Sequence, residues 1–295
     1  MNPLFMIGMH GLGDNIYQRP FVRAEARRRE VYLSTPWPEL YEDLQVKFVR
    51  PARQYRTQTK NIDRQAEGRW AKTMPRHRDA QGFWYGLKGM DDNAVREFER
   101  QFAMDTPLRF DLPDTGPSPV GSRKPVAVIR PVTIRAEWRN RARNPDPRYV
   151  WLATRILKSR GWHTVSVADV DPPTETYLGD PPACDQEFNV GELTVGPLMA
   201  LIRHAELVVG GVGWIVPAAI AAETPLIVIG GGLGSHNAPE KLTDPRMDLS
   251  RVRFILPSPY CRCESAAHDC PKRIPGFRAQ FERAVEAINP ARMAA

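Results

Sequence analysis

Apolar residues in this chain gather in short runs that are separated by longer amphipathic stretches. The runs at 207–210 (LVVG) and 226–229 (LIVI) are wholly apolar, which is typical of parallel strands buried on both faces. The stretch 147–160 has apolar residues on one helical face, begins after Asp146, a good N-cap residue, and ends before Gly161. Strands that alternate with helices in this way predict an α/β fold with parallel sheets.

The same pattern predicts elements along the whole chain. The expected strands are 3–8, 30–34, 46–49, 126–130, 164–168, 207–210, 226–229 and 252–256. The expected helices are 15–29, 93–103, 147–160, 198–204, 215–222 and 276–288. The segment 112–125 is rich in Pro, Gly and Ser, as linkers are. We therefore expect an N-terminal domain at 1–115, a C-terminal domain at 116–275 and a final helix at 276–295, with a ligand cleft between the domains.

Composition adds that this is an ordinary globular chain. Of its 295 residues, 42% are hydrophobic and 25% are charged, and the length fits two domains. The uncharged stretch 207–222 is short for a membrane span and is broken by glycines and a proline, so no transmembrane segment is predicted. No basic region precedes the apolar start, and we expect a cytoplasmic protein. Four cysteines argue against a disulfide scaffold.

The net charge of +7 is local. The segment 50–78 holds nine Lys or Arg against Asp63 and Glu67, a surplus equal to that of the whole chain, and aromatic residues lie in or beside it. Such a segment suits a polyanionic acceptor, although a solvated loop is the plain alternative. The residues that we expect to contact the acceptor here are Arg53, Arg56, Lys60, Trp70 and Trp84.

A glycine-rich turn after the first strand is the first candidate for chemistry. It reads GMHGLGD at 8–14, so Gly11 and Gly13 allow a ligand to approach the backbone, and Asp14 follows at a helix start. The spacing is not G-x-G-x-x-G and does not indicate a dinucleotide site. Asp14 suits a general base, but it also suits a simple helix cap.

A second candidate lies near the C-terminus, where Cys261, Cys263, His268 and Cys270 fall within ten residues. Three thiols and an imidazole are a ligand set for a structural zinc ion. Reduced buried thiols, or a disulfide between Cys263 and Cys270, are the alternatives.

Three segments resemble a known family. GLGD with Pro20 in the following helix, RPVTIRAEW at 130–138, and the passage 195–225 are similar to the heptosyltransferase-like glycosyltransferases, the ADP-heptose:lipopolysaccharide type of family 9. The resemblance implies a GT-B fold, in which two Rossmann-like domains face a central cleft. It also implies an acceptor-binding N-terminal domain and a C-terminal domain that binds a nucleotide-sugar, here a UDP- or ADP-sugar. Val212 and Val216 depart from the polar residues of the family.

The resemblance further implies sugar transfer with inversion and without a metal cofactor. Asp14 would be the base, and Gly11 and Gly13 would lie against the acceptor. Residues expected at the donor are Arg130, Arg135, Gly211, Gly213, Trp214 and Glu187. The acidic acceptor would be a phosphorylated bacterial saccharide or DNA with a hydroxymethylated base. Two other functions stay open: a sugar-nucleotide 2-epimerase, and a non-catalytic nucleic-acid-binding protein on a GT-B scaffold.

Overall fold

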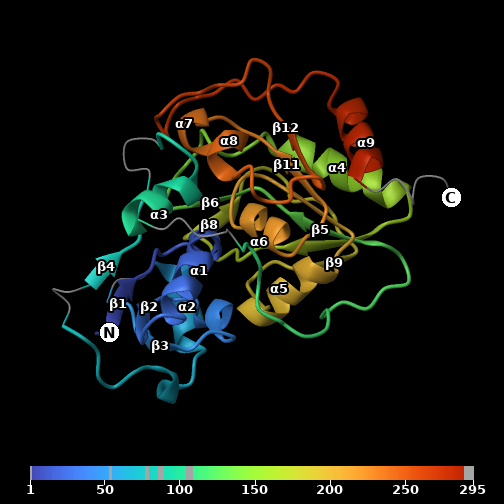
Figure 1. Ribbon diagram of the computed structural model, residues 1–295. Helices are drawn as coiled ribbons and strands as arrows, with labels where there is room; N and C mark the ends of the chain where they lie inside the picture. Colours follow the sequence, from blue (N-terminus) through green and yellow to red (C-terminus); the bar gives the residue numbers. More distant parts are fainter. Residues whose placement is uncertain (1, 53–54, 77–79, 86–89, 104–108, 289–295) are drawn as a thin grey trace.

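The computed structural model describes residues 2–52, 55–76, 80–85, 90–103 and 109–288. It contains two parallel sheets, one in each half of the chain, with helices packed around them (Figure 1). The N-terminal sheet has the order β3-β2-β1-β4, and its strands are β1 (Leu4–Ile7), β2 (Val31–Ser34), β3 (Val46–Val49) and β4 (Ala80–Gly82). This arrangement confirms the predicted α/β fold with parallel sheets.

The C-terminal sheet has six parallel strands in the order β12-β11-β10-β5-β7-β9. They are β5 (Val126–Arg130), β7 (His163–Val167), β9 (Gln186–Phe188), β10 (Leu207–Gly210), β11 (Leu226–Ile229) and β12 (Val252–Ile255). A small antiparallel pair, β6 (Thr133–Arg135) and β8 (Glu175–Tyr177), stands beside this sheet. Every strand predicted from the apolar runs is present within two residues of its expected bounds.

The helices are α1 (Leu12–Ala26), α2 (Arg56–Asp63), α3 (Ala94–Phe102), α4 (Pro147–Ser159), α5 (Val195–His204), α6 (Ile215–Ala221), α7 (Gly234–Asn237), α8 (Pro239–Leu242) and α9 (Phe277–Ile288), with short 3-10 turns η1 (Pro38–Tyr41) and η2 (Glu67–Arg69). The Asp146 carboxylate accepts a hydrogen bond from the Arg148 N–H, as predicted for the N-cap of α4. Helix α1 begins three residues earlier than expected, so Asp14 lies in its first turn.

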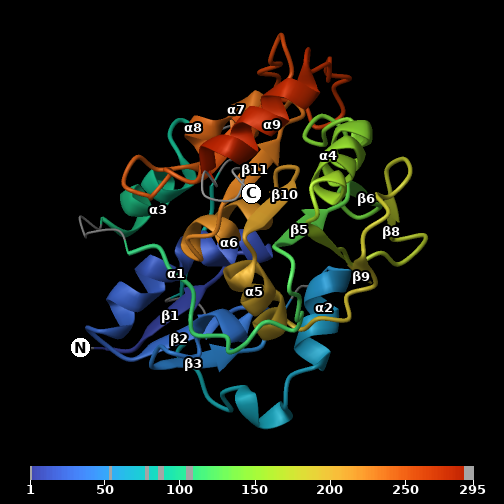
Figure 2. The ribbon, with the colours of Figure 1, turned by 90° about the vertical axis from the view of Figure 1, so that its right-hand side faces the viewer.

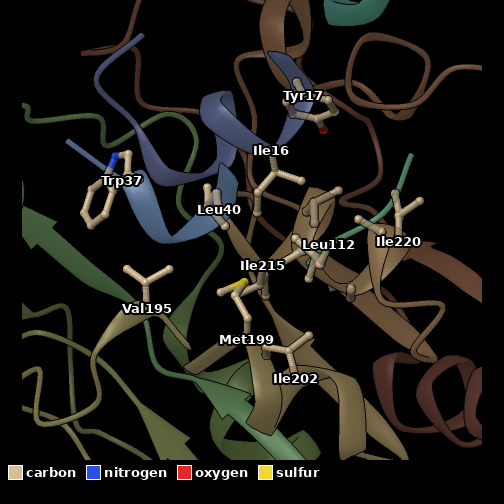
Figure 3. Close-up of a cluster of buried hydrophobic side chains, with 14 of the residues drawn as sticks. Ile16, Tyr17, Trp37, Leu40, Leu112, Val195, Met199, Ile202, Ile215 and Ile220 are labelled. Carbon is tan, nitrogen blue, oxygen red and sulfur yellow. The ribbon is translucent and has the colours of Figure 1, made fainter. Parts of the chain in front are cut away.

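The two halves share one hydrophobic core. Figure 3 shows Ile16 of α1 and Leu40 of η1 from the N-terminal half facing Met199 of α5 and Ile215 of α6 from the C-terminal half, and all four are fully buried. The predicted linker 112–125 forms no helix or strand, and its Leu112 is buried in the same core. The halves are therefore packed against each other on one side. No helix in the described part of the chain is both long and apolar enough to span a membrane.

Candidate active site

A cavity of about 780 Å³ lies between the two halves, at the carboxyl ends of strands in both sheets. Its wall includes the glycine-rich turn after β1, part of α2, the loop from β5 to α4, and the loops after β10 and β11. The ends of parallel strands are where α/β folds bind their ligands. The cavity thus occupies the place that the sequence predicts for a cleft.

Asp14 lines this cavity from the first turn of α1. Its carboxylate accepts hydrogen bonds from the Gly11 backbone N–H and from the hydroxyl of Tyr85. Burial raises the pKa of Asp14 above its ordinary value, while Tyr85 and the nearby charge of Arg143 oppose that rise. The carboxylate therefore takes part in the helix start and also faces the cavity.

Two glycines are required for this geometry. A Cβ atom on Gly11 would collide with the Asp14 carboxylate, so a larger residue would displace the candidate base. A Cβ atom on Gly13 would lie 2.9 Å from the Cα of Trp214. Gly13 therefore lets the start of α1 approach the start of α6, which joins the turn after β1 to the C-terminal half.

Three arginines line the cavity from the C-terminal half. Arg130 ends β5 and lies beside Gly213, whose added Cβ would be 3.2 Å from its Nη1. Arg135 donates from Nε to Glu175 Oε2 at 2.8 Å. Arg143, on the loop before α4, lies under the Trp138 ring, with its Cζ 4.8 Å from the ring centroid. Burial and neighbouring cations lower the pKa of Arg130 and of Arg143 to about 10, so both stay charged at neutral pH.

Helix α2 reaches across to the C-terminal half, and Figure 2 shows it beside β9. Arg56 lies 3.2 Å from Asp169 Oδ1 and 3.1 Å from Glu175 Oε2. Lys60 Nζ donates to Asp169 at 2.8 Å and to the Val190 carbonyl at 2.6 Å. These two predicted acceptor residues therefore bridge the halves of the protein, and Lys60 also lines the cavity.

Gly11 and Gly13, which are also predicted at the acceptor, line the cavity, whereas the two predicted tryptophans do not. Trp70 is 9% exposed and pairs with Phe48 at the edge of the N-terminal sheet, so its ring is not available for stacking in this structure. Trp84 is 59% exposed but is not part of the described cavity wall. Arg53 lies outside the described residues.

Some of the predicted donor residues line the cavity and others do not. Gly213 and Trp214 line the cavity. Gly211 is buried against Pro145, where an added Cβ would lie 2.9 Å from the proline Cδ. Glu187 is exposed on β9 and accepts a hydrogen bond from Asn189, outside the described cavity wall.

The two departures from the family pattern are packed apolar residues. Val216 is fully buried and Val212 is 6% exposed. Val216 is not part of the described cavity wall, whereas Val212 is. Neither side chain offers a polar contact to a donor.

Several cavity residues are not among the predicted site residues, although Tyr85 is one of the aromatic residues beside the basic segment. Tyr85 follows β4, and Arg143 lies in an irregular loop. His236 and Asn237 line the cavity after β11, where the run GGGLGS at 230–235 is a glycine-rich turn that could have indicated them.

The four residues of the predicted metal set come together. The ligand atoms of Cys261, Cys263, His268 and Cys270 all lie within 4.8 Å of one another. The Sγ atoms of Cys263 and Cys270 are 3.4 Å apart, and His268 Nδ1 is 3.3 Å from Cys270 Sγ. All four cysteines of the described chain are free thiols, so the alternative disulfide is not formed in this structure.

Comparisons with known proteins show which solved structures have the same fold. No protein-family model and no curated protein matches the sequence. Among solved structures, the iron-containing dodecameric glycosyltransferase TibC of enterotoxigenic E. coli has a TM-score of 0.61 at 17% identity, with 98% of this chain and 76% of that chain covered. The E. coli ADP-heptose lipopolysaccharide heptosyltransferase II has a TM-score of 0.55 at 14% identity, with 97% and 100% covered. E. coli heptosyltransferase WaaC with ADP has a TM-score of 0.52 at 13% identity, with 97% and 100% covered.

The chain thus has the GT-B fold of the heptosyltransferases over nearly its whole length. The similarity predicted from three sequence segments is confirmed at the level of the fold.

Proposed function

We propose that the protein is a glycosyltransferase that moves a sugar from a nucleotide-sugar to a hydroxyl group of an acceptor. One observation carries the proposal: a single cavity between the two halves holds the Asp14 carboxylate together with the guanidinium groups of Arg130 and Arg135. A carboxylate accepts a proton from a hydroxyl, and guanidinium groups bind a departing diphosphate. The fold shared with heptosyltransferases supports the same chemistry.

In this mechanism Asp14 takes the proton of the acceptor hydroxyl while the hydroxyl oxygen attacks the anomeric carbon. The bond from that carbon to the diphosphate oxygen breaks, and attack from the opposite face inverts the anomeric configuration. Arg130 and Arg135 stabilise the charge that develops on the diphosphate, so no metal ion takes part in the proposed step. The backbone N–H groups of Gly213 and Trp214 are further candidates for donor contact.

For the donor, we propose an ADP-sugar first and a UDP-sugar second. Of the solved structures with the same fold, TibC was studied with ADP-D-beta-D-heptose and WaaC with ADP. These relatives are only 15% and 13% identical to the chain, so they support a choice of ligand to test and leave the sugar to the experiment.

For the acceptor, we favour a phosphorylated bacterial saccharide over DNA. Arg56 and Lys60 are already paired with carboxylates of the C-terminal half, and Trp70 is packed in the N-terminal sheet. These contacts leave fewer free cations and rings for a DNA strand than the sequence predicts.

The test is a transfer assay with ADP-heptose and UDP-sugars, read by mass spectrometry. The acceptors are a lipopolysaccharide core that lacks heptose and a hydroxymethylated DNA duplex, and the Asp14→Asn variant is the control. A product with either acceptor supports the proposal and decides the acceptor. Epimerised sugar-nucleotide without acceptor would favour the 2-epimerase alternative. Salt-sensitive DNA binding without any turnover would favour the non-catalytic alternative.

We also propose that Cys261, Cys263, His268 and Cys270 hold one structural metal ion, with Zn²⁺ as the first candidate. Three thiolates and one imidazole form a complete tetrahedral set for zinc, and the four ligand atoms already converge. Because TibC is described as iron-containing, iron is the competing ion. Elemental analysis of the purified protein decides between them, and a protein without bound metal would contradict the proposal.

A further inference from the structure

The guanidinium group of Arg143 lies near the candidate base Asp14, although no sequence motif predicts it there. Arg143 lines the cavity together with Asp14 and Tyr85. Its Nε is buried and has no hydrogen-bond partner among the described residues. A buried donor on a charged group costs free energy if it stays unpaired, so such a group in a cavity is suited to bind an anionic ligand.

The carboxylates near Arg143 already have other partners. Glu175 is paired with Arg135 and Arg56, and Asp14 is hydrogen bonded to Tyr85 and Gly11. Within the described residues, neither Arg143 nor Arg130 is within ion-pair distance of a carboxylate, and both line the same cavity. The described contact of the Arg143 guanidinium is with the Trp138 ring. Two guanidinium groups that have no carboxylate partner match the two negative charges of a diphosphate.

The loop that carries Arg143 is held from several sides. The Asn140 side chain accepts from the Arg143 N–H at 3.0 Å, and Asn144 donates to the Thr133 carbonyl at 3.0 Å. Ala142 donates its N–H to the Ala266 carbonyl at 3.0 Å and accepts from Gly232 at 2.6 Å. Ala266 lies within the metal-ligand segment 261–270.

This segment also touches the other side of the cavity wall. Ala142 and Leu233 pack against Cys270, and Gly234 donates its N–H to the Cys261 carbonyl at 3.1 Å. The segment 261–270 is therefore placed to fix two parts of the cavity wall at once, the Arg143 loop and the start of α7.

We propose that Arg143 binds the donor diphosphate together with Arg130, and that the metal-ligand segment 261–270 holds the Arg143 loop in position for this contact. The first part rests on the proposed function only for the nature of the ligand, a nucleoside diphosphate. The second part also requires a metal ion at the cysteine and histidine ligands.

The first test measures binding of ADP, UDP, AMP, adenosine and inorganic diphosphate by calorimetry. Arg143→Ala should weaken ADP or UDP binding about tenfold to a hundredfold, with little change for adenosine, and Arg143→Lys should recover part of the loss. Arg141→Ala is the matched control, since Arg141 lies on the same loop and is exposed.

Equal losses for ADP and adenosine, or no loss at all, would overturn the role of Arg143. So would a wild-type protein that binds none of the diphosphate probes. Because the assay measures binding alone, a protein that binds ADP through Arg143 but transfers no sugar would contradict the proposed function and leave this inference intact.

The second test uses Cys270→Ser and His268→Ala, with Cys184→Ser as the control outside the metal-ligand segment. Metal content and diphosphate affinity should fall together in the first two variants and stay unchanged in the third. The loss of affinity should be much smaller when Arg143 is already alanine, because both changes then remove the same contact. Metal loss without loss of affinity, or a wild-type protein without metal, would overturn the second part.

Discussion

At the scale of single residues, Asp14 both accepts hydrogen bonds at the start of α1 and faces the cavity as the proposed base. Asp14→Asn keeps an oxygen that can accept from Gly11 and Tyr85, but an amide cannot take the acceptor proton. We expect transfer to be lost while nucleotide binding is retained. Since burial raises the pKa of Asp14, its ionised form is less favourable in the folded than in the unfolded protein, so thermal stability at neutral pH should be unchanged or higher. Near-normal turnover of Asp14→Asn would show that Asp14 is not the base and has only a structural role at the start of α1.

Tyr85 donates a hydrogen bond to Asp14, so it should influence the pH dependence of the proposed base. Its hydrogen bond lowers the pKa of Asp14 against the rise caused by burial. In Tyr85→Phe that opposition is gone, so the acid limb of kcat/KM should move to higher pH, with a smaller effect on the plateau. Tyr17→Phe is the control, because Tyr17 lines the same cavity and donates instead to the Leu242 carbonyl. An unmoved acid limb in Tyr85→Phe would show that Asp14 is not the titrating base.

The sequence predicts part of this site and misses part of it, for a physical reason. Asp14, Gly11 and Gly13 are evident because they follow one strand directly and share a local turn. Tyr85 and Arg143 come from loops 71 and 129 residues further along the chain. Nothing local requires a tyrosine or an arginine there, and only the packing of the two halves brings them to Asp14.

At the scale of elements, α2 is a helix that the hydrophobic pattern of the sequence does not predict. Its sequence, RTQTKNID, has one apolar residue, Ile62, that is buried, so no amphipathic period predicts a helix. The basic residues that suggest a solvated or acceptor-binding segment instead meet Asp169 and Glu175. The short polar strands β6, β8 and β9 escape prediction for the same reason, whereas the buried strands are found because they are apolar on both faces.

Helix α2 should therefore depend on its partner across the cavity. Asp169→Asn removes the charge that pairs with Arg56 and Lys60, and we expect a local destabilisation of about 1.5–3 kcal/mol. Hydrogen exchange should become faster in α2, with little change in the N-terminal sheet. Arg69→Ala is the control, because Arg69 pairs with Glu42 inside the N-terminal half. Equal protection of α2 in Asp169→Asn and wild type would show that the bridge contributes little.

At the scale of the whole molecule, the shared core predicts that the two halves unfold together. Ile215 is fully buried where α6 meets α1, and Ile215→Ala should cost about 2–5 kcal/mol. The loss should lower the stability of both sheets in one transition, as followed by hydrogen exchange in β1 and in β5. A variant in which only the C-terminal sheet became less stable would mean that the halves fold independently.

The shared core also limits how this protein can be recombined with others. In a two-domain transferase with a bare cleft, one domain could be replaced by that of a relative to change the sugar that is used. Here a cut in the linker 112–125 would expose Ile16 and Leu40 on one fragment and Met199 and Ile215 on the other. A chimaera would therefore have to take α1, η1, α5 and α6 from the same parent protein, because their side chains pack in one core. For the proposed glycosyltransferase, a change of donor specificity is therefore more readily reached by substitution in the cavity wall than by swapping halves.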